Sequence, residues 1–390
     1  MKISNLEIIC FKVKNYGKLS FPPPNFLLKG TYILKINTDE DVYGMGEVSS
    51  YVGNFNQIQK VFTYFIAPLI LNKKISSINL TQNTFLEKAH RKNFPKQIFG
   101  SVISAVIQAL LDIRGKIIKK PIFEIIKEKK ELSLKAYASG GLIYDDEKYD
   151  KLVEEALECK HKGFVGWKLR PSIPKNFLSH KKRMERPPKI NFSELKKFCL
   201  KIRKLVGPNF KLMIDLGCRL EGTISSKKIL DFFYELDFYF VEEPFRRNIK
   251  TYKKLLKNSK LSIAAGENTS SFSDLNKLSS CKKINFFQPD TNLNPIPEII
   301  KFSKKKGIKI ILHNWTKSIS MYSNFHLGLA LDNCKLVEYS ILKFPDEFSF
   351  LEKNYHIKKG KITLSKSPGL GIELNSEILN RHTLCKKIID

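Results

Sequence analysis

The sequence lacks the features of a disulfide-bonded or membrane-spanning protein. Its seven cysteines are odd in number and scattered, without a CxxC pair. This usage excludes a disulfide scaffold or a cysteine-based zinc site and is typical of reduced thiols. No run reaches the roughly 18 uncharged apolar residues that cross a bilayer. Residues 1–14 lack the apolar core and cleavage site of a signal peptide. We expect a cytoplasmic protein with no membrane partner.

Acidic residues are scarce relative to basic ones. The chain has 68 Lys and Arg against 38 Asp and Glu, a formal charge of +30, which suggests nucleic-acid binding as one interpretation. The lysines, however, are spread along the whole chain and mixed with Ile, Asn and Phe, and no recognition helix or RNA-binding motif accompanies them. We therefore expect no nucleic-acid partner and interpret the charge as a field that attracts small anionic substrates.

The first third of the chain predicts a small domain in which strands precede helices. Residues 6–14 are strand-like, and residues 31–50 are typical of a β-hairpin. Residues 78–128 have apolar positions at helical spacing in a segment that is interrupted at Pro121. We predict an α+β capping domain over residues 1–128.

Residues 129–345 alternate between short apolar runs and amphipathic helical segments. Hydrophobic residues make up 42% of the chain, enough for a large core. The strand-like runs lie at 132–139, 164–170, 210–215, 238–243, 261–267, 284–290, 308–313 and 335–340. Eight strands that alternate with helices predict an α/β fold, a modified TIM-type (β/α) barrel beside the capping domain. We expect residues 346–390 to pack back on the cap and Pro171–Pro188 to form a surface insertion.

Ionisable residues occur at the ends of these strands at regular spacing. They are Asp215, Glu242, Glu267, Asp290, His313 and Glu338, separated by 27, 25, 23, 23 and 25 residues. Any one acid alone could be a helix cap, and His313 alone could be a core histidine. Because the carboxyl ends of all barrel strands open at one mouth, six residues in register predict one polar cavity. Lys168 and Arg170 join it from the second strand.

Three of these acids predict a metal site. Asp215, Glu242 and Glu267 would repel one another in a buried cavity, and packing them without a cation is costly. Ligand sets made only of oxygen favour Mg²⁺, with Mn²⁺ as a substitute. We therefore predict a divalent-cation site at the mouth of the barrel.

Short motifs follow one another in a characteristic order. They are SAVIQALLDIRGKIIKKPIFEII, GFVGWKLRPS, MIDLG, VEEP, AAGE, FFQPD, ILH and LVEYS. Together they resemble the enolase superfamily, specifically its mandelate racemase-like subgroup, over nearly the whole chain. The resemblance implies a capping domain, a barrel and Mg²⁺ bound by Asp215, Glu242 and Glu267. Glu243 is the alternative to Glu242, but the family uses the first acid of this pair.

The resemblance also implies roles for the other mouth residues. His313 is similar to the family's base on one face of the substrate, and Asp290 to the acid that orients it. Lys168 is similar to the lysine that contacts the substrate carboxylate. Glu338 is similar to the acid that hydrogen-bonds the developing enediolate. Ser139, at the end of the first strand, is expected to line the same site.

Three features depart from the family pattern. Arg170 stands where many members carry a second lysine, the base for the other face, and arginine holds its proton too tightly for that task. Gly217 stands where many members have an asparagine that helps to bind the hydroxyl end of the substrate. The segment after Asp290, TNLNPIPE, lacks the usual Gly-Gly. These departures leave the substrate open.

We predict Mg²⁺-dependent removal of the proton next to a carboxylate through an enediolate. The preferred reaction is dehydration of a sugar acid, an aldonate or aldarate, to a 2-keto-3-deoxy acid by a lyase. The alternatives are a racemase or epimerase of a 2-hydroxy acid and a catalytically silent sugar-acid-binding protein. Family branches with a lysine at the sixth strand, the muconate cycloisomerases and dipeptide epimerases, do not fit Asp290. The resemblance implies a homo-oligomer, a dimer or an octamer.

Overall fold

The computed structural model describes most of the chain. The described ranges are 1–12, 31–78, 95–127, 133–144, 148–173, 190–220, 224–245, 249–257, 259–316, 318–342, 349–352 and 355–390. The predicted insertion Pro171–Pro188 lies outside these ranges except for its first three residues, which belong to a strand.

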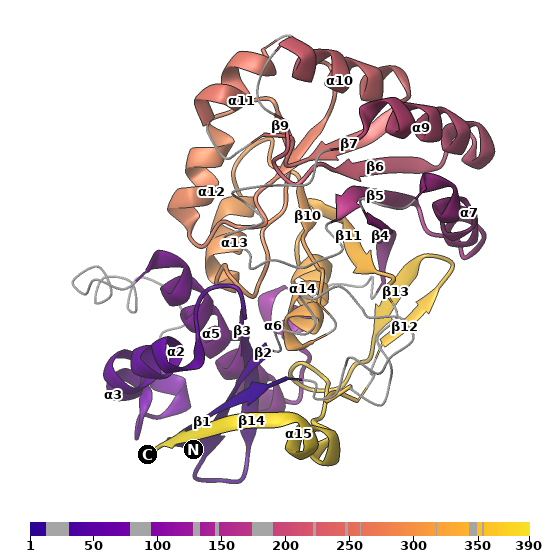
Figure 1. The fold of residues 1–390 in the computed structure, drawn as a ribbon. Helices are drawn as coiled ribbons and strands as arrows, with labels where there is room; N and C mark the ends of the chain where they lie inside the picture. Colours follow the sequence, from indigo (N-terminus) through magenta and orange to yellow (C-terminus); the bar gives the residue numbers. More distant parts are fainter. Residues whose placement is uncertain are drawn as a thin grey trace.

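Eight parallel strands close into a barrel (Figure 1). They are β4 (Ser133–Tyr144), β5 (Gly166–Ile173), β6 (Lys211–Asp215), β7 (Phe238–Glu242), β8 (Ile263–Ala265), β9 (Ile284–Phe287), β10 (Ile310–Leu312) and β11 (Cys334–Ser340). Each strand pairs in parallel with the next, and β11 pairs in parallel with β4, which closes the ring. The predicted barrel is confirmed.

Helices between the strands form the outer layer of the barrel. They are α7 (Leu152–His161), which a short 3₁₀ turn η4 (Tyr149–Lys151) precedes, α9 (Phe192–Val206), α10 (Ile224–Glu235), α11 (Ile249–Leu255), α12 (Phe272–Ser279), α13 (Ile296–Ser303) and α14 (Ile319–Ala330). In α9, the side chain of Asn191 caps the first turn by accepting a hydrogen bond from Glu194 N. Leu195, Phe198 and Ile202 recur at helical spacing and are buried, so α9 turns one apolar stripe toward the barrel.

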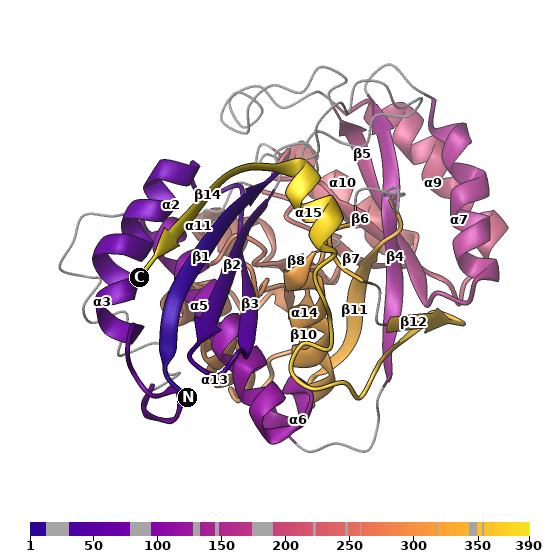
Figure 2. The same cartoon turned by 90° about the horizontal axis from the view of Figure 1, so that it is seen from below.

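A four-stranded antiparallel sheet forms the cap, in the order β14-β1-β2-β3 (Figure 2). Its strands are β1 (Ile3–Phe11), β2 (Thr31–Thr38), β3 (Tyr43–Val48) and β14 (Thr383–Ile389). The predicted hairpin is therefore present as β2 and β3. The helical elements are α2 (Phe55–Val61), the π-helix η2 (Phe62–Ile66), α3 (Ala67–Ile70), the 3₁₀ turn η3 (Ile75–Ser77), α5 (Lys96–Ile118) and α6 (Ile122–Ile126).

Helix α5 is the core helix of the cap. It is long and apolar enough to cross a membrane by length and composition, but 94% of its most apolar window is buried inside the fold. Strand β3 lies directly on it, since a Cβ at Gly46 would come within 1.9 Å of the carbonyl oxygen of Ala105. Asp112, fully buried on α5, accepts hydrogen bonds from Met45 N and Leu370 N. These contacts hold α5 in the centre of the cap.

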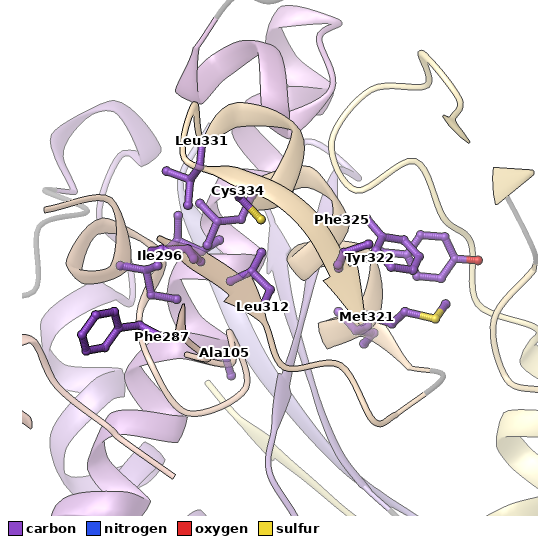
Figure 3. Close-up of a cluster of buried hydrophobic side chains, with 14 of the residues drawn as sticks. Ala105, Phe287, Ile296, Leu312, Met321, Tyr322, Phe325, Leu331 and Cys334 are labelled. Carbon is purple, nitrogen blue, oxygen red and sulfur yellow. The ribbon is translucent and has the colours of Figure 1, made fainter. Parts of the chain in front are cut away.

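The cap also packs on the barrel through α5. Figure 3 shows Ala105 of α5 in one buried cluster with Phe287 of β9, Ile296 of α13 and Leu312 of β10. Because this core is continuous across the two parts, the cap has a fixed place relative to β9 and β10, the strands that precede Asp290 and His313.

The C-terminal residues attach at two places. The hairpin of β12 (Tyr355–Lys358) and β13 (Lys361–Leu364) extends the barrel sheet, since β13 pairs antiparallel with β4. After α15 (Ser376–His382), β14 pairs antiparallel with β1 in the cap. We propose a division into a cap at 1–128, a barrel at 129–345 and a C-terminal segment at 346–390, with the segment bound to both.

Candidate active site

The predicted residues converge on one mouth of the barrel. Lys168 and Arg170 lie on β5, Asp215 and Glu242 are the last residues of β6 and β7, Glu267 follows β8, Asp290 follows β9, His313 follows β10, and Glu338 and Ser139 lie on β11 and β4. The strand pairing places neighbours in register, with Asp215 beside Glu242 and Ser139 opposite Ser340. Ser139 is fully buried.

Asp215, Glu242 and Glu267 form a compact carboxylate cluster. One oxygen of each lies within 4.8 Å of the others. Glu242 is fully buried, and its Oε1 has no hydrogen-bond partner within the described ranges. Burial raises the pKa of Glu242, and the Asp215 charge adds to this effect although Lys168 opposes it. An orphaned buried oxygen beside two other carboxylates fits a hard divalent cation.

The structure separates Glu242 from its neighbour Glu243. The Glu242 side chain points into the barrel, where Lys168 Nζ donates to its Oε2 over 2.7 Å. Glu243 instead accepts hydrogen bonds from Gly266 N at Oε1 and from the Tyr252 hydroxyl at Oε2. Glu243 therefore supports the loop after β8, and Glu242 is the acid of this pair that belongs to the carboxylate cluster.

Lys168 joins two acids at the floor of the mouth. Its Nζ lies 2.7 Å from Glu242 Oε2 and 2.6 Å from Glu338 Oε1, and all three side chains are almost completely buried. Burial alone would lower the pKa of Lys168, but Glu242 and Glu338 raise it above its usual value. Burial alone would raise the pKa of Glu338, but Lys168 and His313 lower it. Lys168 is therefore charged, and Glu338 is an ionised hydrogen-bond acceptor in this arrangement.

His313 and Asp290 form a hydrogen-bonded pair. His313 Nδ1 lies 2.8 Å from Asp290 Oδ2, and the other ring nitrogen, Nε2, lies 3.4 Å from Glu267 Oε2. Burial would lower the pKa of His313, but the hydrogen bond to Asp290 and the charges of Glu338 and Glu267 raise it to about 10. Asp290 thus fixes the ring so that Nε2 faces the carboxylate cluster.

Arg170 contacts Asp215 and Trp315. Its guanidinium pairs with Asp215 Oδ2 and stacks on the ring of Trp315, 4.3 Å from the ring centroid. Burial would lower the pKa of Arg170, but Asp215 and Glu267 raise it further above its already high value. Arg170 is a permanent cation here and is held in place from two sides.

Comparisons with known proteins agree with this geometry. Residues 29–126 match the mandelate racemase / muconate lactonizing enzyme N-terminal domain, and residues 151–378 match the family described as enolase C-terminal domain-like. The chain belongs to the mandelate racemase/muconate lactonizing enzyme family of the enolase superfamily. The predicted membership is confirmed.

Relatives in this family match the chain almost from end to end. An arabinonate dehydratase of Saccharolobus solfataricus is 24% identical over 359 residues, 90% of each chain. A D-galactonate dehydratase of Xanthomonas euvesicatoria is 23% identical over 363 residues, 89% of this chain and 90% of the relative. The solved 3,6-anhydro-D-galactonate cycloisomerase of Zobellia galactanivorans superposes with a TM-score of 0.79 at 22% identity, over 98% of this chain and 99% of the other.

The departure at Gly217 has a backbone explanation. Gly217 has φ +54°, in the left-handed region that glycine and asparagine tolerate. Its N–H donates to Asp215 Oδ1 over 2.8 Å, so this turn holds one acid of the carboxylate cluster. A Cβ at Gly217 would lie 3.7 Å from Arg219 Nε, which places a guanidinium beside the position that is an asparagine in many family members.

Sequence reasoning missed three polar residues of this site. Gln288 Nε2 donates to Glu242 Oε2 over 2.8 Å, and Asn314 N donates to Glu338 Oε2 over 2.9 Å. Asn324, on α14, contacts both members of the His–Asp pair. Gln288 could have been found, because it lies two residues after Phe286 and so faces the same side of the strand. Asn324 carries no comparable signal, since it lies on a helix far along the chain.

Proposed function

We propose that this protein is an enzyme that removes the proton next to the carboxylate of a sugar acid and eliminates the β-hydroxyl as water. The observation that carries the proposal is the direction of His313. With Nδ1 bound to Asp290, Nε2 faces the cluster of Asp215, Glu242 and Glu267 and lies 3.4 Å from Glu267 Oε2. A substrate carboxylate bound at that cluster would present its α-carbon to this nitrogen.

The cluster fits Mg²⁺, which when bound supplies Lewis-acid stabilisation of the enediolate charge. Three carboxylates and an orphaned oxygen at Glu242 provide oxygen ligands for it. Lys168 adds a second positive charge, fixed before the reaction by Glu242 and Glu338. Because Glu338 is ionised in this arrangement, we assign it the task of holding Lys168 rather than that of a proton donor.

His313 carries the proton through the reaction. The base is the neutral imidazole, which a cation bound at Glu267 would favour by offsetting one of the charges that raise the pKa of His313. In that form Nε2 takes the α-proton, and the imidazolium that results is stabilised by Asp290. The C–O bond to the β-hydroxyl then breaks, and the hydroxyl leaves as water with the proton from His313. The enol that remains tautomerises to the 2-keto-3-deoxy acid, so substrate yields keto acid and water with no further reactant.

Arg170 supports dehydration over racemisation. A racemase needs a base on each face of the α-carbon, and Arg170 stands where the second base would lie. Its pairing with Asp215 and its stacking on Trp315 keep it protonated. The arabinonate and D-galactonate dehydratases among the relatives also favour a sugar-acid substrate. A small-molecule anion as the partner, a homo-oligomeric state and a cytoplasmic location remain predictions.

The test is a screen of the purified protein with Mg²⁺ against a library of aldonates and aldarates, scored for 2-keto acid. We expect keto acid from at least one member, dependent on Mg²⁺ and abolished by chelation. The screen should be repeated in D₂O. A one-base dehydratase leaves recovered substrate with its original configuration at C2. Accumulation of the deuterated C2 epimer without keto acid would replace the proposal with a racemase, and the absence of any exchange or product would favour a silent binding protein.

A further inference from the structure

Asp290 and His313 are both held by one buried side chain on a neighbouring helix. Asn324 lies on α14 and is fully buried. Its Nδ2 donates to Asp290 Oδ1 over 3.1 Å and to the backbone oxygen of His313 over 3.0 Å. Its Oδ1 accepts a hydrogen bond from Thr291 N over 3.1 Å. Both N–H groups and the carbonyl of this amide are therefore used by the His–Asp pair and the residue beside it.

This support matters because Asp290 does not lie on a strand. Strand β9 ends at Phe287, so Asp290 stands three residues into the following loop. Within that loop, Asn292 N donates to Asp290 Oδ1 over 3.0 Å. Asn324 adds a bond from outside the loop to the same oxygen and leaves Asp290 Oδ2 for His313 Nδ1. The position of the carboxylate relative to the imidazole ring therefore depends on α14 as well as on the loop.

The cap holds the same loop from its other side. The carbonyl oxygen of Thr291 accepts hydrogen bonds from Ser104 Oγ and, over 2.5 Å, from Gln108 Nε2, both on α5. Ser101 Oγ, one turn earlier on α5, donates to the carbonyl oxygen of Asn292 over 2.6 Å. Thr291 is thus held through its carbonyl by the cap and through its N–H by Asn324.

We propose that Asn324 is a positioning residue for the general base and that helix α5 of the cap reaches this base through Thr291. The role of His313 as the base rests on the proposed function. The shape of the asparagine amide is needed, because aspartate offers no donor to Asp290 and serine offers one hydroxyl in place of two N–H groups and a carbonyl. The side chain of Asn324 hydrogen-bonds Asp290, His313 and Thr291, so it acts on the reaction through them.

The chain provides a matched control on the same helix. Ser323 precedes Asn324, is also fully buried, and its Oγ has no hydrogen-bond partner in the part of the chain that the structure covers. Ser323→Ala therefore removes a buried polar atom from the same turn without removing a contact to the His–Asp pair. His326, two residues beyond Asn324, is an internal reference for the docking of α14, since its Nδ1 accepts from Phe123 N and its Nε2 lies 3.1 Å from the carbonyl oxygen of Leu370.

The experiment needs no substrate in its first part. Protein labelled with ¹⁵N-histidine is compared by NMR with Mg²⁺ present for the native chain, Asn324→Ala, the isosteric Asn324→Asp, and Ser323→Ala. His313→Asn assigns the His313 resonances. We expect both Asn324 variants to shift or broaden the His313 Nδ1–H resonance, while the His326 resonances stay in place. Ser323→Ala should leave both histidines unchanged.

The second part measures turnover with arabinonate and D-galactonate. We expect Asn324→Ala to lower kcat about 10- to 100-fold, with KM changed little. This is the range found when a residue that orients a metal ligand by a hydrogen bond is substituted. Ser323→Ala should retain kcat. Unchanged His313 resonances in both Asn324 variants, or loss of the His326 resonances together with those of His313, would overturn the inference. His313→Asn with native turnover would instead overturn the proposed function and leave the NMR result standing.

Discussion

The interior of the barrel contains two layers of side chains, which lie two residues apart along the strands. The lower layer is apolar and consists of Tyr137, Met213, Phe240, Ala264, Phe286, Ile311 and Leu336. Two residues further along six of these strands lie Ser139, Asp215, Glu242, Gln288, His313 and Glu338. Because side chains two apart in a strand face the same side, both layers point inward. The inward-facing positions of these six strands therefore contribute first to the apolar core and, two residues later, to the polar site.

The two layers have opposite energetic roles. Phe240 is fully buried among aromatic rings, with centroids 5.9 Å from Tyr137 and 5.8 Å from Phe286, and such packing stabilises the fold. Glu242, two residues later, is equally buried, but burial disfavours its charge. The packing of the lower layer thus offsets the cost of burying charged groups in the upper layer, a distribution typical of active sites. The predictions below separate these two roles.

The largest effect is expected in the upper layer, at the base. His313→Asn should lower turnover by about 10²–10⁴-fold, the loss expected when a general base is removed. The fold should persist, since the variant keeps a polar group at a partly exposed site. Steady-state kinetics on the substrate found in the screen, with circular dichroism as the folding control, measure this. A variant with near-native rates would remove His313 from the mechanism.

In the lower layer, Phe240→Ala should act on stability instead. Removing a fully buried phenylalanine costs about 3–5 kcal/mol of unfolding free energy. Denaturant unfolding followed by tryptophan fluorescence gives this value. If Phe240→Ala unfolds at the native denaturant midpoint, the assignment of stability to this layer is wrong.

Glu242 and Glu243 are adjacent, but only Glu242 points into the upper layer, so substituting each in turn tests the assignment of residues to that layer. Glu242→Gln should weaken Mg²⁺ binding by at least about tenfold, because a carboxylate in the cluster loses its charge. Glu243→Gln should leave Mg²⁺ binding close to native and act on stability, since its partners are Gly266 N and Tyr252. Calorimetric titration with Mg²⁺ measures both. Equal losses of affinity in the two variants would contradict the distinction drawn from their side-chain directions.

The smallest expected effect is on the pH dependence of stability, measured in the absence of metal. Burial raises the pKa of Glu242 above its ordinary value of 4.5, so the folded state binds this proton more tightly than the unfolded state. The contribution of Glu242 to stability is therefore fully present below about pH 4.5, the ordinary pKa of the group. It decreases as pH rises from there through the raised pKa of the folded state. Unfolding measured from pH 5 to 8 in a chelator should show this decrease, with a shallower slope in Glu242→Gln. Saturating Mg²⁺ should also reduce the slope, because the cation compensates the charge.

The sequence was sufficient to predict the barrel and the mouth at which its polar residues gather. Three strand ends were wrong, because Glu267, Asp290 and His313 lie beyond the last residues of β8, β9 and β10. Strand-like runs recur at the spacing of a β/α unit, and that regularity places Asp215, Glu242 and His313 at one mouth by topology alone. The choice of Glu242 over Glu243 came from the family resemblance, and it agrees with the position of Glu242 two residues after the inward-facing Phe240. The cap sheet was predicted in part, because its hairpin is local in sequence.

Other features depend on contacts that local sequence does not encode. Asn324 meets Asp290 across 34 positions of the chain, and no spacing rule relates a helix interior to a loop before it. The pairing of β13 with β4 is also remote in sequence. The ionised state of Glu338 depends on Lys168 and His313 together, a balance of charges that only the three-dimensional arrangement reveals. These are the places where tertiary contacts, and not periodicity, decide the outcome.

The pairing of β1 with β14 also determines when the cap can be completed. β1 is synthesised before its partner β14, which follows roughly 370 residues later. At about 5–20 residues per second, a ribosome needs roughly 20–70 s to supply that partner. During this time the hairpin of β2 and β3 can cover one edge of β1, while the other edge remains open to pairing with another chain. The much later strand β14 is thus the one that covers the exposed edge of β1.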